Sequence, residues 1–312
     1  MLSNTSLPLP LQQWASDGSF LSLGPFQHRV FTKMYGSPDA EPADTLLLLH
    51  GFPESSFSYH ANIDGLLGFF QRIIVFDFLG YGLSDKPLEG FTYSLFEQTD
   101  IALQVWRHYG IKGGHILAHD MGDTVLTELI ARSEQDLLPQ WFSAGILSAT
   151  FTNGNMVMEK AKLRITQKWL LTQRGGPILG KLLNFPMFKQ QVKSTSRSAG
   201  LSDETIDLMW AAIHHNQGRR LFHVIIRYLN DRKRFQNHRW LPPLRHTQIP
   251  LHICWGDQDL VAPVSVPQYL KQEVMPQATL SFIEGVGHFC QLENPDAWLG
   301  QVSQFWVNYQ SL

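Results

Sequence analysis

The chain has 312 residues, of which 44% are hydrophobic, 12% aromatic and 17% charged, and its formal net charge at pH 7 is −2. A hydrophobic fraction of this size with so little net charge excludes an intrinsically disordered chain. The near-neutral total also gives no overall attraction to nucleic acid or to an anionic membrane. We therefore expect a globular protein of one large domain or two smaller ones, with no nucleic-acid partner.

Three features predict a cytoplasmic protein without a membrane span. The two cysteines, Cys254 and Cys290, are too few for a disulfide framework and lie outside any CxxC pair. The first basic residue is Arg29, so no charged segment precedes an apolar run as in a secretory signal. The longest apolar stretches have the length of strands, far below the roughly 18 residues of a membrane helix.

Short apolar runs that end at Gly, Pro or Asp predict strands, and longer amphipathic stretches between them predict helices. Residues 20–24 and 28–35 are typical of an opening hairpin. Helices are expected at 93–109 and 122–132. Runs that are apolar on both faces, as in buried parallel strands, occur at 45–49, 72–76, 115–118, 144–147 and 251–255. This alternation predicts βαβ units and an α/β fold with a mostly parallel sheet flanked by helices.

The strand pattern breaks between residues 151 and 245. This segment has no convincing strand, but it has a helical stretch at 219–228. The basic run Arg232-Lys233-Arg234 is expected on a solvated helix face. A helical insertion of this kind is typical of a lid. We expect a core made of residues 1–150 and 246–312, with a helical cap at 151–245.

The sequence Ala118-His119-Asp120-Met121-Gly122 lies where a strand is expected to turn into a helix. It fits the nucleophile elbow, which has small residues on both sides because the tight turn brings backbone segments together. The nucleophile position, usually Ser, holds Asp120. The alternative is that Asp120 only caps the helix, and Ser148 or Ser55 near other strand ends could serve an esterase.

A carboxylate at this position predicts a particular chemistry. A carboxyl group with an ordinary pKa of about 4 is ionised at neutral pH and needs no base before it attacks. Attack on an acyl group would give a labile anhydride, whereas attack on a saturated carbon gives an alkyl ester that water can then hydrolyse. Asp120 as nucleophile therefore points to an electrophilic carbon with a leaving oxygen or halide.

The remaining candidates follow other predicted strands. The backbone amides of Phe52 and Met121 are expected to form an oxyanion hole. His288 would activate water as the general base, and Asp259 would orient it; we prefer Asp259 to Asp257 because it lies further past the strand end. By itself His288 could also be a packed loop histidine. The chain order of nucleophile, acid and histidine matches that of α/β-hydrolases.

These motifs resemble the α/β-hydrolase superfamily over essentially the whole chain, and within it the aspartate-nucleophile branch of epoxide hydrolases and haloalkane dehalogenases. Residues 50–55, HGFPES, are similar to an epoxide hydrolase stretch, and residues 77–84, DFLGYGLS, to a shared DxxGxGxS stretch. The resemblance implies that a cap tyrosine protonates the leaving oxygen, and Tyr228 is the candidate. The family's second cap tyrosine has no counterpart; Trp169, His214 or His215 could substitute.

The resemblance implies an epoxide hydrolase that acts on a small hydrophobic epoxide or a related electrophile and water, without a cofactor or metal. A haloalkane dehalogenase is less well matched, because the places that hold halide-binding Trp or Asn in that family hold Met121 and Phe52. Trp169 or Trp210 could supply a donor instead. A non-catalytic ligand-binding protein on this fold is the third reading, and a homodimer is possible.

Overall fold

The computed structural model describes residues 7–154, 156–197 and 200–310. A single eight-stranded sheet has the order β1-β2-β4-β3-β5-β6-β7-β8. The two opening strands are antiparallel to their neighbours, and every other pairing is parallel. The strands are β1 (Ser19–Leu23), β2 (His28–Gly36), β3 (Thr45–Leu49), β4 (Arg72–Phe76), β5 (Gly113–His119), β6 (Gly145–Thr152), β7 (Leu251–Gly256) and β8 (Thr279–Ile283).

The predicted strands are confirmed, and the burial of their side chains explains why the sequence shows them. All residues of β3, β4, β5 and β7 are buried, so both faces of these strands are apolar rather than alternating. The opening hairpin pairs β1 with β2 as expected. Only β6 differs markedly, because it continues to Thr152, beyond both the predicted strand end and the expected start of the cap.

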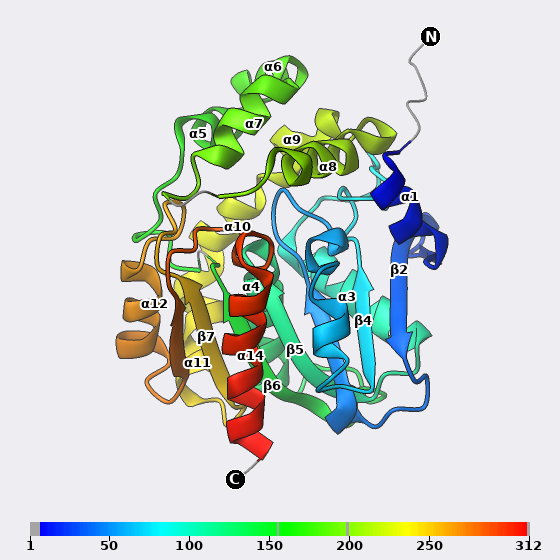
Figure 1. The fold of residues 1–312 in the computed structure, drawn as a ribbon, viewed down its shortest axis with the longest axis vertical. Coiled ribbons are helices and arrows are strands. Elements are labelled where there is room, and N and C mark those ends of the chain that lie inside the picture. Colours follow the sequence, from blue (N-terminus) through cyan, green and yellow to red (C-terminus); the bar gives the residue numbers. More distant parts are fainter. Residues whose placement is uncertain (1–6, 155, 198–199, 311–312) are drawn as a thin grey trace.

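Helices cover both faces of the sheet, and a group of them lies beyond the carboxyl ends of its strands (Figure 1). The helical elements of the core are α1 (Leu9–Ser16), η1 (Pro42–Asp44), η2 (Ser56–Tyr59), α2 (Ile63–Leu66), α3 (Leu95–His108), α4 (Met121–Ser133), α12 (Ser265–Tyr269), η5 (Leu270–Val274), α13 (Cys290–Glu293) and α14 (Pro295–Gln310). The two predicted core helices are α3 and α4. Ser94 begins α3 by accepting a hydrogen bond from the Glu97 amide.

All the elements described between β6 and β7 are helical. This segment contains α5 (Ile165–Leu170), α6 (Gly175–Leu182), α7 (Phe185–Lys193), α8 (Asp203–His214), η3 (His215–Leu221), α9 (Phe222–Ile225), α10 (Tyr228–Phe235), η4 (Gln236–Trp240) and α11 (Leu241–His246). We use "cap" for α5 to α9, which lie above the sheet in Figure 1. In contrast, η4 and α11 pack against α4 of the core.

One predicted helix of this segment is wrong in its continuity. Residues 219–228 were expected to form one helix, but they are divided among η3, α9 and the first residue of α10. The residues just before this stretch, Asn216 and Gln217, have left-handed backbone angles with φ of 50° and 61°. These residues set the stretch apart from α8. The stretch itself is interrupted at Ile226 and Arg227, between α9 and α10, so the amphipathic spacing alone overestimates the length of the helix. No helix in the described ranges has the length and apolar content needed to cross a bilayer.

Candidate active site

Asp120 lies at the tight turn between β5 and α4. Its backbone has φ 44° and ψ −103°, a conformation that few non-glycine residues adopt. The side chain makes no capping hydrogen bond to α4. The helix-cap alternative therefore does not explain the residue. A strained turn whose carboxylate is released from the helix presents that carboxylate to the space above the sheet.

The carboxylate of Asp120 faces two donors from different parts of the chain. The Phe52 amide donates to Oδ2 over 3.1 Å, and the Tyr228 hydroxyl lies 3.5 Å from the same oxygen. Met121 is the first residue of α4, so its amide has no acceptor within the helix. The structure thus brings together Asp120, the proposed tyrosine and the two residues expected to supply oxyanion-hole amides.

His288 is held by Asp259. Nδ1 of the imidazole and Oδ2 of Asp259 are 2.8 Å apart, and both side chains are buried. The other oxygen of Asp259 accepts hydrogen bonds from the amides of Val261 (2.6 Å) and Ala262 (2.9 Å). Asp257 instead accepts from the Gly285 amide. The acid beside the histidine is therefore Asp259, the residue preferred from its distance past the strand.

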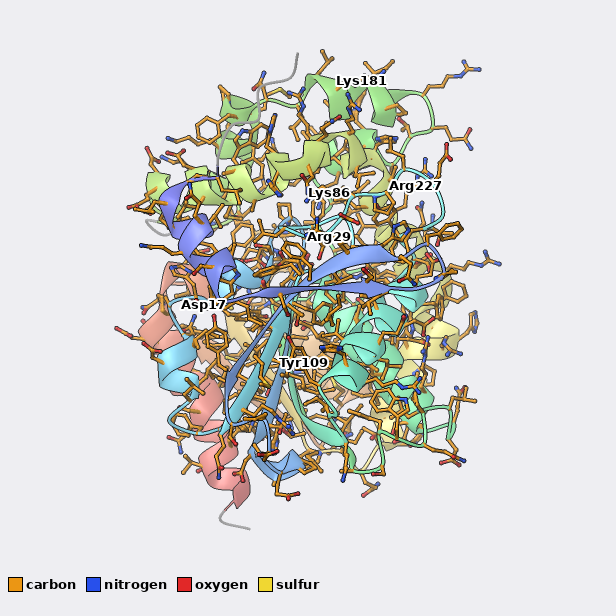
Figure 2. The ribbon with its side chains drawn as sticks, turned by 90° about the vertical axis from the view of Figure 1, so that its right-hand side faces the viewer. Asp17, Arg29, Lys86, Tyr109, Lys181 and Arg227 are labelled. Atoms are coloured by element: carbon orange, nitrogen blue, oxygen red, sulfur yellow. The ribbon has the colours of Figure 1, made fainter. Side chains whose placement is uncertain are left out.

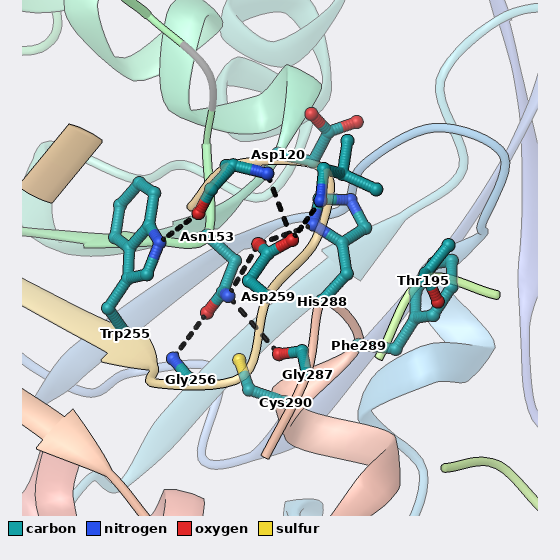
Figure 3. A network of polar contacts seen from close by, with 12 residues as sticks. Asp120, Asn153, Thr195, Trp255, Gly256, Asp259, Gly287, His288, Phe289 and Cys290 are labelled. Atoms are coloured by element: carbon teal, nitrogen blue, oxygen red, sulfur yellow. Dashed lines mark hydrogen bonds and ion pairs between the residues drawn. The ribbon is translucent and has the colours of Figure 1, made fainter. Parts of the chain in front are cut away.

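Asn153 also holds Asp259, and the sequence analysis did not identify it. Its amide nitrogen donates to Asp259 Oδ2 (2.8 Å) and to the Gly287 carbonyl (3.2 Å), while its oxygen accepts from the Gly256 amide. Figure 3 shows this network joining the loops after β6, β7 and β8. Asn153 directly follows β6 and has φ 51°, so an Asn at the end of a parallel strand was the available signal.

The two carboxylates near His288 favour its protonated form. Burial by itself would lower the pKa of the imidazole, but the hydrogen-bonded Asp259 and the nearby Asp120 outweigh burial and raise the pKa to about 9. In the resting site His288 is therefore mainly an imidazolium at neutral pH. Any reaction that neutralises Asp120 removes one of the charges that hold this proton.

A second buried acid lies behind the elbow. Oε2 of Glu54 and Nε2 of His119 are 3.1 Å apart, and Oε1 accepts a hydrogen bond from Gln291. Burial raises the pKa of Glu54 to about 8, and burial together with the nearby His288 lowers the pKa of His119 well below its usual value. The pair is therefore mainly uncharged at neutral pH, so it adds little charge next to Asp120.

Arg232 corrects an expectation from the sequence. The basic run was expected to be solvated, and Lys233 and Arg234 are exposed, but Arg232 is only 1% exposed. Its guanidinium donates to the Asp120 carbonyl (2.7 Å) and to the Thr124 hydroxyl (2.8 Å), and Nη2 lies 3.5 Å from Asp120 Oδ1. Arg232 is one helical turn after Tyr228, so the face of α10 that meets the elbow carries both.

An apolar cavity lies above Asp120 and His288, between the core and the cap. Tyr228 and Phe52 line it beside the two catalytic candidates, and Arg164, Thr166 and Gln167 add polar groups. Its apolar wall consists of Leu170, Leu183, Phe188, Val192, Phe222, Val261 and Phe289. A mostly apolar wall around a few polar groups is typical of a site for a hydrophobic small molecule.

Several side chains offered as substitutes for a second tyrosine or as halide donors lie outside this wall. Trp169 is 60% exposed, and Trp210 packs against Phe185, Phe188 and His214. Neither tryptophan lines the cavity, and neither does His214 or His215. In the described ranges no cluster of His, Cys, Asp and Glu has the arrangement of a metal site.

Several known proteins have sequences similar to this chain. The mesoderm-specific transcript homolog protein of Bos taurus is 34% identical, covering 95% of this chain and 88% of the relative. The putative hydrolase LipZ of Mycobacterium tuberculosis is 36% identical, covering 92% and 95%. Epoxide hydrolase B of Mycobacterium tuberculosis is 34% identical over a shorter stretch, 28% of this chain and 25% of the relative.

The family model described as the alpha/beta hydrolase fold matches residues 44–295. This range includes the elbow, the cap and the loops that carry Asp259 and His288. The parallel sheet, the inserted helices and the strand-end positions of these side chains agree with that match. The chain therefore belongs to the α/β-hydrolase family, and its hydrolase-named relatives support a hydrolase.

Proposed function

We propose that the protein is an epoxide hydrolase that works through a covalent alkyl ester on Asp120. The observation that carries the proposal is the placement of one carboxylate oxygen, Asp120 Oδ2, between the Phe52 amide and the Tyr228 hydroxyl in an apolar cavity that His288 also lines. The family and the partial similarity to an epoxide hydrolase support the same reading.

In the first step the Asp120 carboxylate attacks one carbon of the epoxide, and the bond from that carbon to the ring oxygen breaks. The leaving oxygen accepts a proton from the Tyr228 hydroxyl. Burial and the nearby Asp120 raise the pKa of Tyr228, so its hydroxyl is protonated in the resting site. As Asp120 attacks and loses its negative charge, one of the effects that hold this proton disappears, and the hydroxyl can donate it. The products of this step are a neutral ester on Asp120, a free hydroxyl on the substrate and a phenolate on Tyr228.

Before the second step the His288 imidazolium loses its proton and the Tyr228 phenolate gains one, so a net proton passes from His288 to Tyr228. Water then attacks the ester carbonyl carbon while neutral His288 accepts a proton from it. The bond from that carbon to the substrate oxygen breaks, the oxygen takes the proton from His288, and the diol departs, leaving Asp120 as a carboxylate.

The Phe52 and Met121 amides are placed to stabilise the oxyanion that forms on the ester oxygen. His288 is mainly protonated in the resting site, where Asp259 and, to a smaller extent, Asp120 raise its pKa; ester formation removes the contribution of Asp120 and makes the proton easier to lose. The first step thus prepares the base for the second, with Asp259 keeping the imidazole oriented.

The side chains next to Asp120 support an epoxide better than a haloalkane, whereas Arg164 and Gln167 bring N–H groups to the cavity wall but form no hydrogen bond with Asp120 in the described part of the chain. A halide leaves without a proton and needs N–H donors, yet Phe52 and Met121 have no side-chain donor. Both Trp169 and Trp210 lie outside the cavity wall. Tyr228, in contrast, has its hydroxyl beside the nucleophile, as departure of an oxygen requires.

The test is intact-mass analysis of a His288→Ala variant after exposure to styrene oxide. We expect the protein mass to rise by one epoxide and peptide mapping to place the adduct on Asp120, because ester formation proceeds and ester hydrolysis is lost. Asp120→Asn is the matched control and should gain no mass. The absence of both adduct and diol with a panel of apolar epoxides would contradict the proposal. Halide release from 1-bromohexane would favour a dehalogenase.

Tyr228→Phe separates the two steps. We expect ester formation to slow by roughly 10²–10⁴-fold, because the variant lacks the proton donor, while hydrolysis of ester already formed changes little. Single-turnover kinetics with rapid quenching measures both rates. Tyr81→Phe is the control, since the Tyr81 hydroxyl contacts the Met121 sulfur and the residue does not line the cavity. Equal slowing of ester formation in the Tyr228→Phe and Tyr81→Phe variants would contradict the role of Tyr228 as proton donor.

A further inference from the structure

The outer side of the cap carries apolar side chains that no packing explains. On α5, Ile165 and Trp169 are 76% and 60% exposed, and on α6, Ile178 and Leu182 are 60% and 63% exposed. Each pair is spaced by four residues and so lies on one face of its helix. The two helices contact each other, so we call these four residues the outer cap patch.

The same part of the chain is strongly basic, which the total charge of −2 hides. Residues 160–197 contain nine Lys and Arg and no Asp or Glu. Without these nine residues the chain has 25 − 9 = 16 basic and 27 acidic residues, which gives a formal net charge of −11. Lys168, Arg174 and Lys181 are exposed, and none forms an ion pair with another described residue. Figure 2 shows Lys181 at the cap end of the molecule.

Helix α5 connects the patch with the cavity. Its Thr166, Gln167 and Leu170 line the cavity, while Ile165 and Trp169 of the same helix face solvent. One short helix therefore separates the apolar cavity from the outer cap patch. A hydrophobic compound dissolved in a bilayer beneath the patch would be one helix width from the cavity.

We propose that the outer cap patch docks on the surface of an anionic lipid bilayer. Tryptophan and aliphatic side chains favour the boundary between headgroups and acyl chains, and Lys and Arg beside them bind anionic headgroups. The outer cap patch supplies the apolar side chains, and Lys168, Arg174 and Lys181 on or between the same two helices supply the basic ones. The remaining charge of −11 is repelled by the same surface, which favours contact through the cap.

The docking does not depend on ester chemistry and can be measured without turnover. The experiment is co-sedimentation of the full chain with vesicles of phosphatidylcholine alone and of phosphatidylcholine with one-third phosphatidylglycerol. We expect binding to the anionic vesicles that is at least about tenfold stronger than to the neutral ones and that weakens with added salt. Equal binding to both, or no binding to either, would overturn the proposal.

Variants locate the surface. A triple variant should weaken binding to the anionic vesicles by about a hundredfold or more, because each basic residue near an anionic surface contributes to the binding free energy. Its substitutions are Lys168→Glu, Arg174→Glu and Lys181→Glu. A control triple variant changes the total charge equally, at exposed positions by the amino ends of the strands. Its substitutions are Arg107→Glu, Lys112→Glu and Arg245→Glu, and its binding should stay within about twofold of the wild type. Equal loss in both triples would mean general charge attraction and overturn the assignment.

Replacement of the apolar residues distinguishes a bilayer from a soluble polyanion. Trp169→Ser with Ile178→Ser removes exposed side chains, so the fold should persist, and binding to the anionic vesicles should fall at least about tenfold. Heparin, which has charge but no apolar phase, should bind both proteins equally and weakly. Vesicle binding that survives the double substitution would overturn insertion into lipid and leave only a polyanion site.

Discussion

At the scale of single residues, the environment of Asp120 is set by buried charges that the sequence does not display as a group. Arg232 lies on its backbone side, with contacts to the Asp120 carbonyl and to Thr124. Its guanidinium carbon is 4.7 Å from the Tyr228 ring centroid, a cation–π contact. One buried cation therefore contacts both the proposed nucleophile and the proposed proton donor.

Arg232→Met should destabilise the protein by about 3–5 kcal/mol, because it leaves buried carboxylates without their cation. Part of this loss should return when Asp120→Asn is added, since the uncompensated charge is then removed. Urea unfolding of the two single variants and the double variant measures the coupling. A cost below about 1 kcal/mol for Arg232→Met would contradict this role, and simple additivity would show that Arg232 acts by packing alone.

At the scale of elements, the site depends on how closely the β5–α4 turn approaches β3. A Cβ atom at Gly122 would lie 2.6 Å from the Leu49 carbonyl oxygen and 2.8 Å from that of His50. Both atoms belong to the backbone and cannot rotate away. The small residue two positions after the proposed nucleophile is therefore required by the crossing of two chain segments, as the elbow motif predicts.

Gly122→Ala should cost about 1–3 kcal/mol in unfolding free energy, because the added methyl group overpacks the turn. Gly300→Ala is the control within a helix: nothing lies within 4 Å of its added Cβ. That change should stabilise α14 by about 0.5–1 kcal/mol. Thermal or urea unfolding compares the two, and a Gly122→Ala protein as stable as the wild type would mean that the elbow can widen.

At the scale of the whole molecule, three chain segments far apart in sequence meet at one edge of the sheet. Asp120 follows β5, Asp259 follows β7 and His288 follows β8, and parallel strands place these ends together. Bringing buried ionisable groups together couples their protonation to folding. His288 and His252 have pKa values shifted in opposite directions, so they should affect the stability of the whole fold in opposite ways.

The folded pKa of His288 is about 9, above its ordinary 6.5. Its contribution to stability is complete below pH 6.5 and lost as pH rises through 9. Burial lowers the pKa of His252 to about 3, so its contribution is present above 6.5 and lost as pH falls. Urea unfolding from pH 5 to 9 measures how much less stable the His288→Asn and His252→Asn variants are than the wild type. This loss of unfolding free energy should fall with rising pH for His288→Asn and rise for His252→Asn. The same trend in both variants would contradict the opposite pKa shifts.

The residue pattern alone predicts most strands of the sheet and most residues of the candidate site. Runs that are apolar on both faces fix β3, β4, β5 and β7 locally, because such residues can only be buried. The elbow around Asp120 and the loops carrying Asp259 and His288 follow strand ends, and strand ends are readable from the pattern. The strand order then brings them to one edge.

The contacts that join separate segments could not be predicted from the pattern, because they depend on how distant elements pack. The burial of Arg232, the support of Asp259 by Asn153 and the exposure of Trp169 depend on which helix face meets the core, and periodicity leaves that open. The interruption of the expected helix at Ile226 and Arg227, between α9 and α10, is likewise not imposed by local propensity. Local pattern determines what can be buried, whereas packing against distant segments determines what each buried polar group contacts.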